Sequence, residues 1–307
     1  MSLSREIKLI LIYTAISFSL PGQNAPGFFT PDPHYNSGRV NGTLLTEGAV
    51  FTGAMVALDF LWYRKFPHSR FHFFNDNSEW LQMDKLGHAT TVYNISALTS
   101  DVYQWSGIQP QRSAWMGGIT GLIFMTTIEI FDGFSNGWGF SSGDMLANTA
   151  GSALAVGQFL GWNEQRIQLR FSYHTTIYPT YRPELLGENG AQRVIKDYNG
   201  QSYWLSANMY SFFGKGDNFP KWLNLDLGYG ADGMTGGKEN PANLNTPEVY
   251  VRQRRFFLSP DIDLARITYS ADWATPIARG LNILKIPAPA VEFNATQKKV
   301  KLHFLYY

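Results

Sequence analysis

The chain has 307 residues, enough for one large domain or two small ones. Its formal net charge of +1 excludes electrostatic capture of nucleic acid, because no basic excess is available to neutralise phosphates. It contains no cysteine, which excludes disulfides, thiolate metal sites, cysteine nucleophiles and a lipid-anchored N-terminal cysteine. Charged residues make up 16% of the chain, against roughly 25% in an ordinary soluble domain, which favours a membrane interface or a rich apolar core.

The first 22 residues are typical of a secretory signal peptide. Arg5 and Lys8 precede an apolar run, Leu9 to Leu20, that is too short to cross a bilayer, which takes about 20 helical residues. A Pro-Gly pair then breaks the run. We therefore expect an exported protein, with an extended, proline- and glycine-rich lead-in over residues 23–42. An uncleaved anchor or a buried first helix is the alternative.

Four apolar segments with helical character follow the lead-in. The predicted helices run over residues 43–66, 83–105, 112–131 and 143–162. Several glycines lie within them, although glycine is costly in an isolated helix. These are Gly117, Gly118, Gly121, Gly151 and Gly157. They make sense where helices approach closely, as they commonly do in membrane proteins.

After Trp162 the hydrophobic period changes from helical to alternating. Residues 167–174, 223–229 and 299–306 alternate apolar with polar side chains, which marks half-buried strands. About five or six strands fit the region 163–307. The predicted fold class is therefore α+β, with an N-terminal bundle of about four apolar helices over residues 43–162 followed by an antiparallel sheet.

A small outer-membrane barrel is the alternative for the C-terminal half, because the chain ends on the aromatic strand Leu305-Tyr306-Tyr307. Such a barrel needs about 8 strands.

Polar residues gather at the ends of the apolar helices, and they are the candidate site. The residues are Asp84, Lys85, His88, Glu129, Asp132, Asp144 and Asn148. Charged groups in an apolar helical unit are expensive unless they are paired, so we expect these to meet in one cluster. Carboxylates with an imidazole could bind a divalent cation or act as general acid and base. The sequence assigns no metal and no cofactor.

The same residues also have a structural interpretation. Ser141-x-x-Asp144 is a capping-box pattern that would only start a helix. Asp84 and His88, at i and i+4, could form an intrahelical pair. Lys85 with Glu129 or Asp132 could form a buried ion pair that fixes packing.

The order of these motifs resembles two known families. Asp84-Lys85-x-x-His88, a helix ending in Glu129, and Asp144-x-x-x-Asn148-x-x-Gly151 resemble the VanZ-like proteins. The string Glu129 to Ser135, followed by Trp138-Gly139-Phe140-Ser141, looks more like the YfiM-like envelope family. The resemblance covers roughly residues 40–162. It implies a predicted periplasmic lipoprotein of unknown function, although the missing cysteine departs from the lipoprotein pattern.

The sequence thus favours a bacterial cell-envelope protein in the periplasm or at the outer membrane, peripheral or partly inserted. We expect a structural or interaction role in envelope maintenance, with membrane lipid or another envelope protein as partner and no nucleic acid. The alternative is a hydrolase that acts on a lipid or a lipid-linked phosphate or ester through the acidic cluster, where desolvation would raise a carboxylate pKa.

Overall fold

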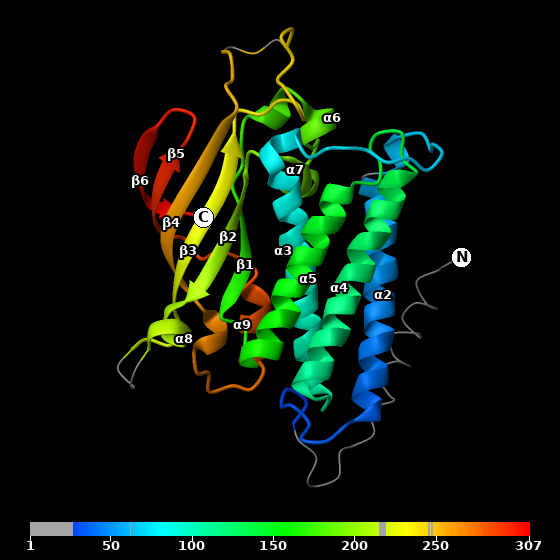
Figure 1. Ribbon diagram of the computed structural model, residues 1–307, viewed down its shortest axis with the longest axis vertical. Coiled ribbons are helices and arrows are strands. Elements are labelled where there is room, and N and C mark those ends of the chain that lie inside the picture. Colours follow the sequence, from blue (N-terminus) through cyan, green and yellow to red (C-terminus); the bar gives the residue numbers. More distant parts are fainter. Residues whose placement is uncertain (1–26, 62, 215–218, 245, 247) are drawn as a thin grey trace, which may run out of the picture.

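The computed structural model describes residues 27–307 except 62, 215–218, 245 and 247. The expected signal peptide, residues 1–22, lies outside this part. Helices fill the N-terminal half of the described chain and strands fill much of the C-terminal half (Figure 1). The mixed class of helices with an antiparallel sheet is therefore confirmed.

Four long helices form the N-terminal half. They are α2 (Ser37–Leu61), α3 (Met83–Trp105), α4 (Pro110–Gly133) and α5 (Ser142–Trp162). The expectation of an extended lead-in is wrong for residues 37–42, which are helical. The helix starts earlier than expected because Asn36 caps it: its side-chain oxygen accepts the Arg39 N–H at 3.0 Å.

Glycines let α3, α4 and α5 pack closely. A Cβ atom on Gly117 would lie 2.3 Å from the Ser96 carbonyl oxygen, and one on Gly151 would lie 2.2 Å from that of Ala89. Gly118 and Gly121 are similarly crowded. The prediction is wrong for Gly157, where a Cβ atom would have no neighbouring atom within 4 Å. Close approach therefore explains four of the five helix glycines.

Helix α2 stands beside this trio and makes fewer contacts with it (Figure 1). Its Glu47 accepts a hydrogen bond from the Tyr103 hydroxyl at 2.9 Å, and Phe51 contacts Phe124 of α4 edge to face. Most of its surface remains exposed. The predicted four-helix bundle is thus three tightly packed helices with a fourth at the side.

The segment between α2 and α3 is extended and folds back over the end of α4. The short helix η1 (Tyr63–Lys65) is followed by isolated bridges that pair His68 with Ser135 and Phe73 with Phe140. These bridges carry Asp76 to the end of the helical trio, where a second short helix, η2 (Glu79–Gln82), leads into α3.

Six strands form one antiparallel sheet in the described chain, and they neighbour each other in chain order. They are β1 (Ile167–Tyr173), β2 (Gln201–Asn208), β3 (Leu223–Asp232), β4 (Gln253–Ile262), β5 (Ala288–Asn294) and β6 (Lys299–Tyr306). The sheet is open, so the barrel alternative is wrong. The segment before β5 takes the free edge of β1, where the Phe171 N–H donates to the Ile283 carbonyl at 2.8 Å.

Short helices at the strand ends complete the chain. They are η3 (Tyr178–Thr180), α6 (Pro183–Leu186), α7 (Gly190–Lys196), α8 (Met209–Phe213), η4 (Leu264–Arg266) and α9 (Ala274–Leu281). The sequence did not predict them, because such short segments carry too little periodicity to stand out.

The glycine packing gives a paired test. Gly117→Ala should lower the free energy of unfolding by about 1–3 kcal/mol, because the new methyl group meets the backbone of α3. Gly157→Ala should instead raise it by up to about 1 kcal/mol, because alanine favours the helix and the site is open. Thermal unfolding of both variants beside the parent measures this. Equal effects at the two positions would contradict the packing argument.

Candidate functional site

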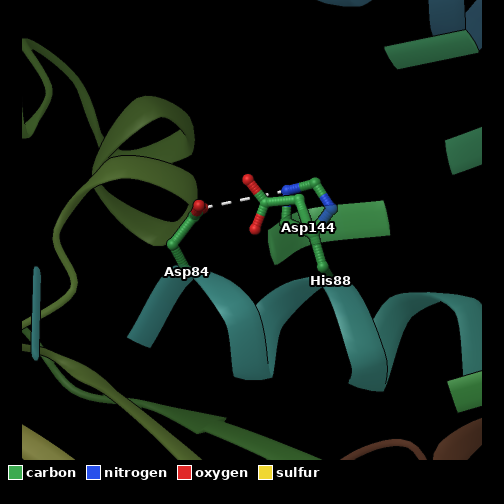
Figure 2. Close-up of side chains that lie close together, drawn as sticks. All are labelled: Asp84, His88 and Asp144. Atoms are coloured by element: carbon green, nitrogen blue, oxygen red, sulfur yellow. Dashed lines mark ion pairs between the residues drawn. The ribbon is translucent and has the colours of Figure 1, made fainter. Parts of the chain in front are cut away.

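The candidate residues converge at one end of the helical trio, where α3 and α5 begin and α4 ends. Asp84 and His88 come from α3, and Asp144 reaches them from α5 (Figure 2). Six of the seven predicted residues meet there, and Asp76 joins them. We call this group the polar cluster: Asp76, Asp84, Lys85, His88, Glu129, Asp144 and Asn148.

Lys85 is the centre of charge in the polar cluster. Its Nζ lies 2.6 Å from Asp76 Oδ1, 2.8 Å from Asp144 Oδ1 and 3.6 Å from Asp84 Oδ2. The lysine side chain is only 14% exposed, so these pairs are poorly screened by water. The expected buried ion pair exists, but its partners are Asp76 and Asp144 rather than Glu129 or Asp132.

His88 occupies the other half of the polar cluster. Its Nδ1 lies 3.2 Å from Asn148 Oδ1 and 3.5 Å from Glu129 Oε1. On the other side of the ring, Nε2 lies 3.9 Å from Asp84 Oδ1, the i,i+4 neighbour (Figure 2). The imidazole therefore links α3 to both α4 and α5.

Ser141 starts α5 and fastens it to its neighbours. Its hydroxyl oxygen accepts the Asp144 N–H at 3.1 Å, as the capping pattern predicts, and its hydroxyl donates to Asp76 at 2.6 Å. In a capping box the acidic residue of the same helix would take the Ser141 N–H. Here Glu129 of α4 takes it at 3.0 Å, which leaves Asp144 for Lys85.

Asp132 is the one predicted residue outside the polar cluster. Its Oδ1 accepts a hydrogen bond from the Tyr63 hydroxyl at 2.9 Å. Conversely, the sequence missed Asp76 and Tyr198, whose hydroxyl donates to Asp84 at 2.5 Å. Asp76 sits in Asn75-Asp76-Asn77-Ser78, which has only turn-like composition. No local pattern could have pointed to either residue.

A strained turn places the start of α3. Trp80, Leu81 and Gln82 all have positive φ angles, between 46° and 65°, which are uncommon outside glycine. The sheet supports this turn, since the Tyr229 hydroxyl donates to the Leu81 carbonyl at 2.6 Å and Arg254 donates to Gln82 Oε1 at 2.7 Å. The sheet therefore helps to position Asp84 and Lys85.

Burial and neighbouring charges shift the titration of the polar cluster. Burial, reinforced by the Asp84 charge, raises the pKa of Asp144 from its ordinary value of 3.8 to about 7. Burial opposes protonation of His88, but the nearby carboxylates, led by Asp84, outweigh it and raise the histidine pKa. Burial likewise works against Asp76 ionisation, yet the hydrogen bonds from Lys85 and Ser141 lower its pKa.

The three residues of Figure 2 offer oxygen and nitrogen atoms that lie within 4.8 Å of one another, close enough to share a metal ion. The ammonium group of Lys85 lies 2.8 Å from Asp144 Oδ1, so a metal cation would have to compete with it for this carboxyl group. A cavity of about 380 Å³ lies nearby, lined by Met55, Tyr63 and Phe131 among others, but no polar-cluster residue lines it. The geometry favours a network that holds helices together.

Residues 72–159 match a family model described as "Predicted periplasmic lipoprotein (DUF2279)". Every polar-cluster residue lies inside the matched region. The description fits an exported envelope protein and supports a periplasmic location. No curated protein matches the chain, and no solved structure matches it.

Removing the central cation tests the structural role. Lys85→Met should lower the free energy of unfolding by roughly 3–5 kcal/mol, because Asp76 and Asp144 would be left buried without their partner. Arg64→Met is the matched control. It breaks an ion pair with Asp59 whose side chains are 53% and 47% exposed, and it should cost at most about 1 kcal/mol. Similar losses in chemical denaturation would count against the network.

The pKa shifts predict how stability depends on pH. Burial raises the pKa of Asp144 in the folded chain to about 7, against the ordinary 3.8 of the unfolded chain, so stability falls as pH rises through this window. The raised His88 pKa acts in the same direction, since its contribution is full below 6.5 and is lost as pH rises through the folded value.

We therefore expect a lower unfolding temperature at about pH 8 than at about pH 5, and a smaller difference in Asp144→Asn. Thermal scans in matched buffers measure it. An unchanged difference in the variant would show that other groups dominate.

Proposed function

We propose that this protein is associated with a membrane of the bacterial envelope, partly inserted through its helices, and has a structural or interaction role there. The observation that carries the proposal is the exposure of helix α2. Its residues 37–60 form a helix long and apolar enough to cross a membrane, yet only 11% of its most apolar stretch is buried. The core helix of a soluble protein is mostly buried, so α2 lacks the cover that its composition requires.

The exposed side chains of α2 are large and apolar. Leu45 is 76% exposed and Val50 is 62% exposed. Burying such side chains gains about 25 cal/mol for each Å² removed from water. A helix with this surface is stabilised by an apolar medium rather than by water.

Helix α4 extends the same surface. Its residues 110–133 also form a candidate span, one third buried, and Ile119 and Ile123 are more than half exposed. The contact between Phe51 and Phe124 joins the two helices. We call the exposed apolar side chains of α2 and α4 the helix face. Membrane lipid is the partner that it fits best.

The polar cluster supports a structural role rather than catalysis. Its carboxylates contact Lys85, His88 or backbone N–H groups, and these contacts join α3, α4, α5 and the segment before α3. A hydrolase would need substrate to reach His88, whose side chain is 13% exposed. The YfiM-like and VanZ-like resemblance concerns this helical unit and is part of the proposal.

Detergent-free fractionation of cells expressing the full chain tests the membrane contact. The parent protein should pellet with membranes and resist a high-salt wash, because the contact is apolar. The double substitution Leu45→Arg with Val50→Arg should move much of it to the soluble fraction. Val249→Arg is the control, since Val249 is 90% exposed but lies in a loop outside the helices.

A parent protein found entirely in the soluble periplasm would overturn the proposal. Pelleting of the double variant as fully as the control would show that α2 is not the contact. Circular dichroism of each variant separates loss of binding from loss of fold.

A further inference from the structure

The buried face of the sheet is largely polar around the cluster of Trp204, Phe257, Ala290 and Tyr306, whereas its exposed face is apolar. On β3, Leu227 is 60% exposed while its neighbour Asp226 is fully buried. On β4, Leu258 is 44% exposed and Ser259 is fully buried. In antiparallel sheets of water-soluble proteins, the apolar face is on the core side and the polar face is solvated. This sheet has the opposite polarity.

The buried polar face is neutralised internally. Arg170 Nη1 lies 2.8 Å from Asp261 Oδ2, and both side chains are fully buried. Lys285 Nζ lies 3.5 Å from Asp261 and 3.8 Å from Asp226. Two cations thus face two carboxylates on the buried face of the sheet. This side is closed to solvent, so the apolar side must meet the surroundings.

The apolar side chains form continuous rows across the strands. The register aligns Leu205, Leu227, Leu258, Val291 and Leu302 in one row. At the β1 and β2 end, α3 covers this side, where Met83 packs with Phe171 and Tyr203. Further along the sheet, the rows are exposed in the part of the chain that the structure describes. We call the exposed apolar side chains of β3, β4 and β5 the sheet face.

We propose that the sheet face contacts the acyl chains of membrane lipid. The inference rests on the proposed function and adds a second lipid contact on strands β3, β4 and β5, which lie on the side of the molecule away from α2 (Figure 1). A protein that merely rests on a membrane could not use both sides. The proposal therefore places the protein within the bilayer rather than on its surface.

Backbone pairing decides which strands can belong to the proposed lipid contact. Hydrocarbon does not tolerate unpaired backbone N–H and C=O groups, so an open edge cannot lie in it. Strands β3, β4 and β5 each pair with a neighbour on both sides, whereas β6 has one free edge. Outward positions from Leu225 to Tyr229, and their partners on β4, carry no charged side chain. Apolar-out, polar-in alternation is the pattern of lipid-exposed strands.

The absence of cysteine makes the test direct, because a single introduced cysteine can carry a fluorescent label. Three full-length variants are reconstituted in vesicles of phosphatidylethanolamine and phosphatidylglycerol: Leu227→Cys on the sheet face, Leu45→Cys on the helix face, and Glu239→Cys in an exposed loop as control. Each label is exposed to iodide in water or to lipids with brominated acyl chains. The Leu227 and Leu45 labels should be quenched several-fold more by brominated lipid than the control.

The outcomes are distinguishable. If the Leu45 label is quenched by lipid and the Leu227 label by iodide, the sheet face meets water, and this inference fails while the proposed function stands. If neither label is quenched by lipid, both fail. A Leu227 label protected from both quenchers is covered by protein, which also overturns the lipid contact. Leu258→Cys repeats the measurement on β4 if Leu227→Cys does not fold.

Discussion

The pairing of Lys85 with carboxylates from two other segments is the constraint on which the helical half depends. A lysine that is 14% exposed needs partners within reach, and they come from α5 and from the segment before α3. Helices α3 and α5 can approach closely enough because Gly151 has no side chain to meet the Ala89 carbonyl. The extended segment before α3 must in turn pair with Phe140, because this pairing brings Asp76 within reach of Lys85. One cation therefore links features that are remote in sequence.

The sheet takes part in this arrangement although it lies outside the matched family region. Tyr229 and Arg254 hold the left-handed turn that precedes α3, and Tyr198 donates to Asp84. Left-handed backbone at three successive non-glycine residues costs energy, and it persists only where the surroundings fix it. The two halves of the chain are thus joined at the point where the polar cluster forms.

Sequence reasoning located what depends on local pattern. Helices α3, α4 and α5 and strand β1 were found within a few residues, because their periodicity is local. The barrel alternative failed because closure depends on which edges meet, and nothing in β1 or β6 encodes the segment at Ile283 that takes the β1 edge. Strands β2, β4 and β5 were not predicted individually. In β2 and β4 the buried positions include Ser206 and Arg255. Polar residues at core positions hide a strand from hydrophobicity.

The candidate site shows the same division. The positions of Asp84, Lys85, His88 and Asp144 at helix ends predicted that they lie together, because unpaired charges in apolar helices are costly to bury. The partner of each charge could not be predicted, because it depends on angles between helices and on a segment with turn-like composition. Asp76 shows this most clearly, since the residue closest to Lys85 Nζ gives no signal in the sequence.

The helical and strand halves break the same rule of polarity in different secondary structures. In each half, charged groups pair inside while leucine and valine face outward. In the helical half Lys85 is paired and Leu45 is exposed, and in the sheet Lys285 is paired and Leu227 is exposed. The family match covers most of α3 through α5 but neither α2 nor the sheet, so shared ancestry of the matched region does not account for both halves. The lipid contacts that we propose for the helix face and the sheet face would account for both, since hydrocarbon penalises exposed charge and tolerates exposed leucine.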